Sequence, residues 1–426
     1  MKKLFKHLLP LLTAVLMLSA CTQEAVTTSE YPPASQSSAD VSSAEESSRE
    51  DSKQEESSKA QSYTVQNSDE PSGQSKADTS GIYRLSEKYF VSRLGSRDLT
   101  AFAELYNAVT ANESRVKFSV PVEENKLDQL MMLLNYDCPE LIHVTGDYST
   151  TYSDETEEYI SGVYFYYNMT PDEYSGKLAQ LEAYFSALRT ELEGRSDYEK
   201  EKYVYDKLFS ECIYNETDKN SGSVYGALIE HSARCEGISK ALMWCLRELG
   251  IECITVVGTP EWDSDSLYGN HSWNLARLDG SWYHIDLTAD NMKSLELQSD
   301  PPLYGFLNTD DDIVYQTRTL SMLYQTMGVP ECSSMKLNYH VMNGLFISEG
   351  EDIRERLYGI LDDRLEAASG CVFSLRLETK GLYNSCVNDW EELLNEYFDS
   401  HRSQKYDDTI YYNSVSQTVA FVITPL

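Results

Sequence analysis

Apolar residues recur at three- and four-residue spacing through residues 235–249, near the middle of a chain of 426 residues. This spacing predicts an amphipathic helix, because it places the side chains on one helical face. The apolar positions are Ile238, Leu242, Cys245, Leu246 and Leu249. Gly250 follows them and is typical of a helix C-terminus. The β-branched run at 251–258 then predicts a buried strand directly after the helix.

Two further strand-like runs, 270–278 and 281–288, are joined by Asp279 and Gly280. Asp-Gly between such runs predicts a β-hairpin with a two-residue loop. In that register Leu278 faces Ser281, and His271 faces Thr288. Because side chains alternate between faces, Asp286 should share a face with His271, one diagonal step away. A three-residue loop without a bulge would separate them, so the prediction depends on the turn.

The preceding segment, residues 82–194, predicts a mixed domain. Helical patterns occupy 100–109 and 127–134, and strand-like patterns at 142–151 and 158–168 indicate a hairpin. Capping boxes that begin at Thr170 and Ser196 predict two helix starts, and the first helix should end near residue 192. This segment holds no catalytic constellation. It either packs against the core that follows or shapes a substrate groove.

The C-terminal part, residues 331–426, predicts a small α/β accessory domain. Its strands are expected at 344–348, 371–377, 409–412 and 418–424, and its helices at 352–368 and 388–398. Because it contains no titratable cluster, we assign it binding or stabilisation.

The N-terminus has a basic start, an apolar run at 8–18 and the sequence Leu18-Ser19-Ala20-Cys21. This pattern predicts a secretory signal peptide over 1–20, too short for a permanent membrane span. Leu-Ser-Ala-Cys resembles the bacterial lipobox, which implies cleavage before Cys21 and acylation of its sulfur; the alternative is a plain signal peptide with an incidental cysteine. Residues 21–81 are dominated by polar and charged residues and predict a disordered tether between a lipid anchor and the body.

The formal net charge of −34 argues against nucleic acid and anionic lipid as partners and suits an extracellular surface. Of nine cysteines, Cys21 and Cys235 are set aside as anchor and candidate nucleophile. The odd remainder excludes a complete disulfide framework without a free thiol. His231 and Cys235 have a one-turn spacing that could hold a metal, but nothing nearby supplies further ligands at regular spacing, so no metal and no cofactor are expected.

Cys235 is the strongest candidate for chemistry because it falls in the first turn of the predicted helix. Unpaired backbone N–H groups and the positive end of the helix dipole favour a thiolate there. His271 is positioned as a general base, and Asp286 as the carboxylate that orients its ring. Trp273 and Trp282 share the face of that pair and would exclude water. The alternative is that Cys235 is only a buried helical cysteine.

Three motifs in this order resemble the transglutaminase-like superfamily, which has a papain-related fold. They are Cys235-Glu236-Gly237, His271-Ser272-Trp273-Asn274 and the run from Gly280 to Asp286. The resemblance covers roughly residues 195–320, and we set the core domain at 195–330. It implies an α+β fold in which the cysteine-bearing helix packs on an antiparallel sheet, with Cys235 as nucleophile, His271 as base and Asp286 as its orienter. Residues 287–290 depart from the family, where Pro and Trp more often flank the Thr. This departure concerns the wall of the substrate pocket and not the three residues Cys235, His271 and Asp286.

The expected activity is acyl transfer at a peptide or protein amide through a thioester. Water as acceptor would make the enzyme a peptidase or amidase, and an amine would make it a crosslinking transglutaminase. The backbone N–H of Cys235 would hold the oxyanion, with Tyr225 as a weak candidate for the second donor. A membrane-anchored, extracellular location favours envelope substrates such as surface proteins or cell-wall peptides. The alternative is a non-catalytic surface binding module on the same scaffold.

Overall fold

The computed structural model describes Leu85 and residues 88–152, 159–260, 271–290, 303–367, 370–401 and 405–426. The predicted signal peptide, Cys21 and the tether lie outside the described residues. Residues 75–426 form one compact unit. Its helices and strands are mixed, which confirms the α+β fold class. Across the described ranges, no helix is both long and apolar enough to cross a bilayer.

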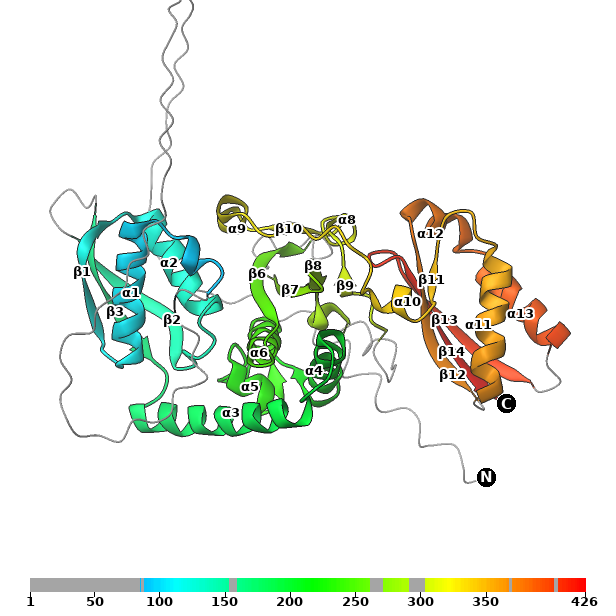
Figure 1. The fold of residues 1–426 in the computed structure, drawn as a ribbon, viewed down its shortest axis with the longest axis horizontal. Helices are drawn as coiled ribbons and strands as arrows, with labels where there is room; N and C mark the ends of the chain where they lie inside the picture. The colour runs from blue at the N-terminus through cyan, green and yellow to red at the C-terminus, as the bar shows by residue number, and fades with distance from the viewer. Residues whose placement is uncertain are drawn as a thin grey trace, which may run out of the picture. The chain divides into compact units, whose positions relative to one another are not determined.

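The lead segment folds into a three-stranded antiparallel sheet accompanied by two helices (Figure 1). Its elements are η2 (Val91–Arg93), α1 (Ser96–Thr110), β1 (Arg115–Val122), α2 (Glu124–Tyr136), β2 (Val144–Tyr152) and β3 (Ile160–Tyr167). The predicted hairpin is confirmed as the β2–β3 pair. Strand β1, which pairs with the other edge of β3, is additional to the predicted elements.

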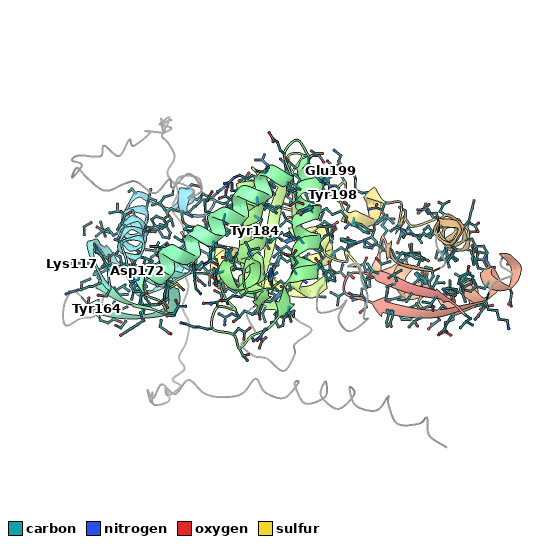
Figure 2. All side chains as sticks on the ribbon, turned by 90° about the horizontal axis from the view of Figure 1, so that it is seen from below. Lys117, Tyr164, Asp172, Tyr184, Tyr198 and Glu199 are labelled. Carbon is teal, nitrogen blue, oxygen red and sulfur yellow. The ribbon has the colours of Figure 1, made fainter. Side chains whose placement is uncertain are left out.

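Two helices follow, α3 (Pro171–Glu191) and α4 (Asp197–Glu211). Both predicted capping boxes are confirmed: Thr170 and Ser196 each accept a backbone N–H from the glutamate three residues on, and that glutamate accepts the cap residue's own N–H. Figure 2 shows Asp172 in the first turn of α3, with Tyr198 and Glu199 in the first turn of α4. These starts fix where the core begins.

The core holds a five-stranded antiparallel sheet of order β10-β6-β7-β8-β9. Its strands are β6 (Glu252–Pro260), β7 (His271–Leu278), β8 (Ser281–Ile285), β9 (Leu307–Thr309) and β10 (Arg318–Leu320). Short β4 (Ile213–Tyr214) and β5 (Ser232–Ala233) pair in parallel nearby. The helices are α5 (Val224–Leu228), α6 (Cys235–Glu248), α8 (Asp311–Val314) and α9 (Met322–Met327). The predicted helix over 235–249 is α6.

The predicted hairpin register is confirmed over the ladder from Leu278–Ser281 to Asn274–Ile285. Asp279 and Gly280 have φ of 49° and 82°, the two positive values that a type I′ turn requires. The second strand is shorter than predicted, because the Asp286 N–H leaves the ladder and donates to the Phe306 carbonyl. Residues 287–290 turn into a helix, so Thr288 does not pair with His271.

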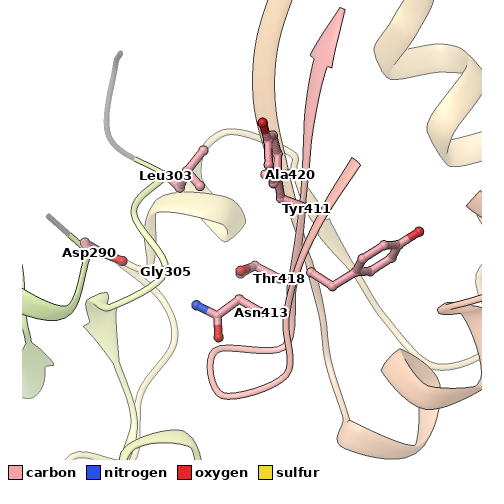
Figure 3. Close-up of a pocket in the computed structure, with 8 residues that line it drawn as sticks. Asp290, Leu303, Gly305, Tyr411, Asn413, Thr418 and Ala420 are labelled. Atoms are coloured by element: carbon pink, nitrogen blue, oxygen red, sulfur yellow. The ribbon is translucent and has the colours of Figure 1, made fainter. Parts of the chain in front are cut away.

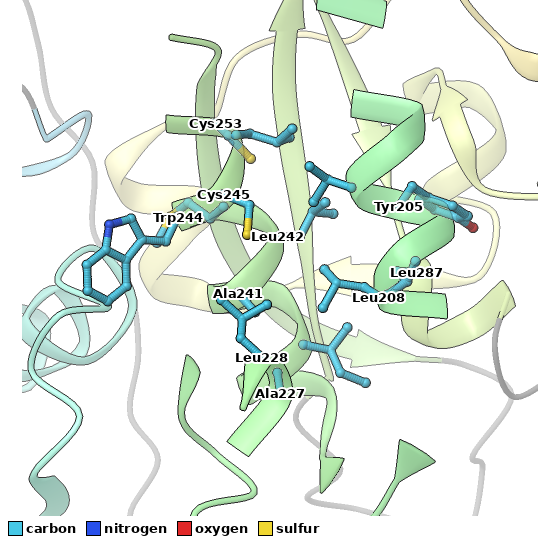
Figure 4. Packing of buried hydrophobic residues seen from close by; sticks show 14 of the residues in the cluster. Tyr205, Leu208, Ala227, Leu228, Ala241, Leu242, Trp244, Cys245, Cys253 and Leu287 are labelled. Atoms are coloured by element: carbon cyan, nitrogen blue, oxygen red, sulfur yellow. The ribbon is translucent and has the colours of Figure 1, made fainter. Parts of the chain in front are cut away.

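The two faces of this sheet belong to two different hydrophobic clusters. Cys253, Ala276 and Tyr283 pack with α3, α4 and α6 in one cluster, part of which Figure 4 shows. Ile254 and Leu275, which are paired across β6 and β7, pack with α1, α2 and the lead sheet in the other. The lead segment therefore shares a core with the sheet that carries His271.

The C-terminal part confirms the predicted alternation of strands and helices. Its sheet has order β11-β12-β14-β13, with β11 and β12 parallel and the other pairs antiparallel. The elements are α10 (Tyr339–Met342), β11 (Phe346–Ile347), α11 (Ile353–Ala367), β12 (Cys371–Leu377), α12 (Lys380–Cys386), α13 (Trp390–His401), β13 (Tyr406–Asn413) and β14 (Thr418–Pro425). Trp390 and Tyr397 are fully buried and belong to its core.

A buried carboxyl on α4 makes stability depend on pH. Burial raises the pKa of Glu201 from 4.5 to about 8, although a hydrogen bond from Asn308 opposes the shift. Glu201 Oε1 and Asn308 Oδ1 are both buried acceptors without a hydrogen-bond partner among the described residues. A proton on Glu201 would supply the missing donor. The folded state therefore holds the neutral acid at pH 7.

The stability that this neutral carboxyl confers is complete below about pH 4.5 and is lost as pH rises to about 8, since only the folded state then keeps the proton. We expect Glu201→Gln to flatten this dependence and to raise the free energy of unfolding at pH 8 by about 1–3 kcal/mol. Urea unfolding at several pH values measures it, with Glu193→Gln as the exposed control. An unchanged pH dependence would contradict a protonated Glu201.

Candidate active site

The structure brings Cys235, His271 and Asp286 together. Cys235 is the first residue of α6 and is partly exposed, whereas His271 begins β7 and Asp286 directly follows β8. The thiol and the imidazole share a hydrogen bond. His271 Nε2 donates to Asp286 Oδ2 at 2.8 Å. Because Nε2 is engaged there, Nδ1 is the nitrogen left to meet the sulfur. The arrangement is that of a nucleophile, a base and an orienting carboxylate.

Charges at this site favour a thiolate and an imidazolium. Burial alone would raise the pKa of the Cys235 thiol, but His271 and hydrogen bonds from Ser272 outweigh it and hold that pKa below 9. Burial would lower the pKa of His271, yet the Asp286 carboxylate and the thiol raise it to about 9. Both shifts favour transfer of the thiol proton to the ring.

Asp286 stays ionised despite complete burial. Desolvation opposes its charge, but His271, Arg318 and the Ala289 N–H together hold its pKa far below the usual range. Arg318 Nη2 donates to Oδ2 at 2.5 Å, and Ala289 N donates to Oδ1 at 3.0 Å. The sequence patterns had not pointed to Arg318, which comes from the distant strand β10.

Polar side chains fix the helix of Cys235 against the strand of His271. Ser239, one turn after Cys235, donates to the Cys235 carbonyl at 2.7 Å and lies 2.9 Å from the Ser272 carbonyl. Asn274 Nδ2 donates to the Ser239 carbonyl at 2.9 Å. Ser239 and Asn274 are polar residues at buried positions of a helix and a strand, and such residues are the sequence signal for this contact. They set the sulfur and the ring in one rigid frame.

Gly237 explains the small residue two positions after the thiol. A Cβ there would lie 2.3 Å from the Ser221 carbonyl oxygen, closer than real contacts allow. The same Ser221 oxygen accepts the Arg234 N–H at 3.0 Å. The loop before Cys235 can therefore rest on the first turn of α6 only if residue 237 lacks a side chain.

The three proposed pocket residues have different positions. Trp273 is buried, and its ring stacks with that of His271 at a centroid distance of 6.0 Å. Trp282 shares the predicted face but lies further along the hairpin, opposite Arg277, where its ring meets Tyr89 at 5.6 Å. Tyr225 donates its hydroxyl to Gln180 at 3.1 Å. These contacts therefore do not favour a role for Trp282 in shielding the His271–Asp286 pair, or a role for Tyr225 as an oxyanion donor.

His284, which lies on the same strand as the residues before Asp286, belongs to a separate cluster with Asp311 and Cys332, whose ligand atoms lie within 4.8 Å of one another. Trp273 Nε1 can only donate, and it donates to His284 Nδ1 at 3.1 Å. His284 Nε2 must therefore carry the ring proton, which it donates to Asp311 at 2.8 Å. Since a metal would need this same nitrogen unprotonated, the donor set fits a hydrogen-bonded core better than a metal site.

Two hollows flank the site. A polar groove of about 230 Å³ adjoins the first turn of α6 and is lined by Arg234, Glu236 and Lys240 together with lead-segment residues such as Asn135. Asn135 bridges the two parts, because it donates to Glu236 at 2.9 Å and accepts from Lys240 at 2.7 Å. The hollow in Figure 3, beside Asp290, has only about 10 Å³, room for one water at most. The groove is the larger of the two, and its lining includes Arg234 and Glu236, the sequence neighbours of Cys235.

The family model of the transglutaminase-like superfamily matches residues 186–287 of the chain. The matched segment contains Cys235, His271 and Asp286. The comparison with curated proteins gave no match.

Three solved structures were also similar. A candidate cysteine protease from Cytophaga hutchinsonii has 15% identity and a TM-score of 0.23, with 34% of this chain and 66% of that chain covered. A TGase has 14% identity and a TM-score of 0.25, with 56% and 59% covered. A candidate protease from Parabacteroides distasonis has 10% identity and a TM-score of 0.22, with 65% and 55% covered. The chain thus spans less than two thirds of the length of each.

Proposed function

We propose that this protein is a cysteine-dependent acyl-transfer enzyme that acts on peptide or protein amides through a thioester at Cys235. The observation that carries the proposal is the hydrogen-bonded series from the Cys235 thiol through His271 to Asp286, with 2.8 Å between His271 Nε2 and the carboxylate. The match of residues 186–287 to the model of the transglutaminase-like superfamily supports the same chemistry.

In the first step, the Cys235 sulfur forms a bond to the substrate carbonyl carbon. The tetrahedral intermediate then expels the amine, which leaves with the proton held by His271. The acyl group remains on sulfur as a thioester. Water or an amine next attacks that carbonyl and gives its proton to His271, the C–S bond breaks, and the thiolate returns. Hydrolysis and transamidation differ only in this acceptor.

The polar groove beside the first turn of α6 supports a peptide substrate, because its lining offers charged and amide groups, among them Arg234 and Glu236 on either side of Cys235 in the sequence. We further propose that Cys21 is lipidated and holds the enzyme at the outer face of the cell membrane, where surface proteins or cell-wall peptides are the expected substrates. The signal-like start and the Leu-Ser-Ala-Cys sequence support this location. The non-catalytic alternative gains no support from a site with all three side chains in contact.

An activated ester tests the chemistry without knowledge of the substrate. With p-nitrophenyl acetate, we expect a burst of nitrophenol equivalent to the enzyme, and a single acetyl group on the peptide that contains Cys235. Adding a primary amine then distinguishes the acceptors: amide product indicates transamidation, and faster acetate release in water alone indicates hydrolysis. The absence of both burst and adduct would refute the proposed function.

A further inference from the structure

Arg318 is a buried cation contributed from beyond the family-matched segment, which ends at residue 287. It begins β10, the edge strand that pairs with β6 through Arg318 and Pro260. Its side chain is completely buried. Burying a guanidinium is costly unless a charged partner compensates, and the carboxylate of Asp286 is within hydrogen-bond distance.

Arg318 and His271 contact the same oxygen of Asp286. Arg318 Nη2 donates at 2.5 Å to Asp286 Oδ2, the same atom that accepts His271 Nε2 at 2.8 Å. Ala289 N occupies the other oxygen. The guanidinium also lies over the Phe306 ring at 4.4 Å, and the Phe306 carbonyl accepts the Asp286 N–H at 3.1 Å. The carboxylate is therefore held from its backbone and from both oxygens.

We propose that Arg318 is a positioning residue of the active site, which fixes the plane of the Asp286 carboxylate and shares its charge with His271. This inference rests on the proposed function. A carboxylate oxygen divided between two cations binds each less strongly than one that serves a single cation. Arg318 thus limits how tightly the imidazolium is held, and it adds positive charge that favours the thiolate.

The sign of its removal follows from the titratable groups linked to Arg318, either directly or through Asp286 and His271. Asp286 and His284 interact with Arg318 directly, Tyr205, Asp290 and His271 interact with Asp286, and Cys235 interacts with His271. Without Arg318, the undivided Asp286 charge stabilises the imidazolium more and the thiolate less. The pKa values of His271 and Cys235 should both rise, so the pH profile of thiolate reactivity should move to higher pH.

The test compares Arg318→Gln and Arg318→Met with Arg318→Lys and with the unsubstituted protein. Iodoacetamide alkylation of Cys235 and acylation by p-nitrophenyl acetate are measured from pH 4 to pH 10. For the two neutral variants we expect both limbs of the pH profile to shift to higher pH by about half to one unit. Acylation at the optimum pH should be about 10–100-fold slower, because the Asp286 carboxylate is less well oriented. Arg318→Lys should restore the pH profile but not the full acylation rate, because lysine restores the positive charge without the planar, two-pronged hydrogen-bonding geometry of the guanidinium.

Arg318→Met keeps an unbranched side chain against Phe306 and protects the test if Arg318→Gln does not fold. Arg247→Gln is the matched control: it removes another buried arginine, paired with Asp137 at 2.6 Å, and should lower stability without moving the limbs. Limbs that coincide with those of the unsubstituted protein would overturn the role of Arg318 while leaving the proposed function intact. An unsubstituted protein with neither a burst nor a lowered thiol pKa would overturn both.

Discussion

Cys235→Ala is expected to lose the acylation burst completely, with at least a 10⁴-fold fall in turnover, on the order found when a covalent nucleophile is removed. His271 and Asp286 cannot form the thioester in its place, since neither side chain carries a sulfur. The fold should persist, because the partly exposed thiol contacts mainly His271 and Ser272. Burst amplitude and thermal unfolding measure the two effects separately.

Cys245→Ala provides the matched control on the same helix. Cys245 is fully buried in the core cluster of α6, and burial raises the pKa of its thiol well above the usual range. We expect it to lower stability by about 1–2 kcal/mol through the cavity that it leaves, with the burst retained. A burst that survives in Cys235→Ala, or that disappears in Cys245→Ala, would place the nucleophile elsewhere.

The contact between His271 and Asp286 could be predicted because it depends on local rules. Asp279-Gly280 selects a turn with two positive φ values, the turn fixes the register, and the register fixes the face of every side chain. None of these steps needs information from distant parts of the chain. The helix start at Cys235 is predictable for the same reason.

Position along a strand is less predictable than face. Trp282 does lie on the predicted face, but alternation says nothing about distance along the hairpin, and the ring packs against Tyr89 instead of the His271 pair. Strand β1 is a different case: Val116, Phe118 and Val122 are buried, and the alternation of apolar and polar residues in this segment is a local signal typical of a strand.

Arg318 could not have been predicted from local sequence. It reaches Asp286 only because the short strand β10 returns to the edge of β6, and this pairing brings together residues distant in the chain. The same holds for Asn135, which joins the lead segment to the first turn of α6. Tertiary pairing supplies the side chains around the candidate site, whereas Cys235, His271 and Asp286 themselves fall within sequence motifs.

Asp286→Asn is expected to slow acylation about 10³–10⁴-fold, the second-largest effect. All three groups that face this carboxylate are donors: His271 Nε2, Arg318 Nη2 and Ala289 N. An amide has one accepting oxygen and one donating NH₂ group, so it cannot accept from the donors on both sides of the carboxylate. If its NH₂ faces His271, the ring must carry its proton on Nδ1 and cannot accept the thiol proton. If its oxygen faces His271, the NH₂ opposes the Ala289 N–H.

The pH profile separates this loss of charge from simple misfolding. Asp286 raises the pKa of His271 to about 9, so its neutralisation should lower that pKa. The ion pair requires a protonated ring, and the alkaline limb of iodoacetamide reactivity should therefore move to lower pH, opposite in direction to the shift expected for the neutral Arg318 variants. Asp290→Asn is the matched control. Burial raises the pKa of Asp290 to about 7, and its Oδ2 accepts from Tyr205 and Phe306, which an amide oxygen can also do. It should cost less than about 10-fold in acylation; an Asp286→Asn loss no larger than that would contradict the orienting role of this carboxylate.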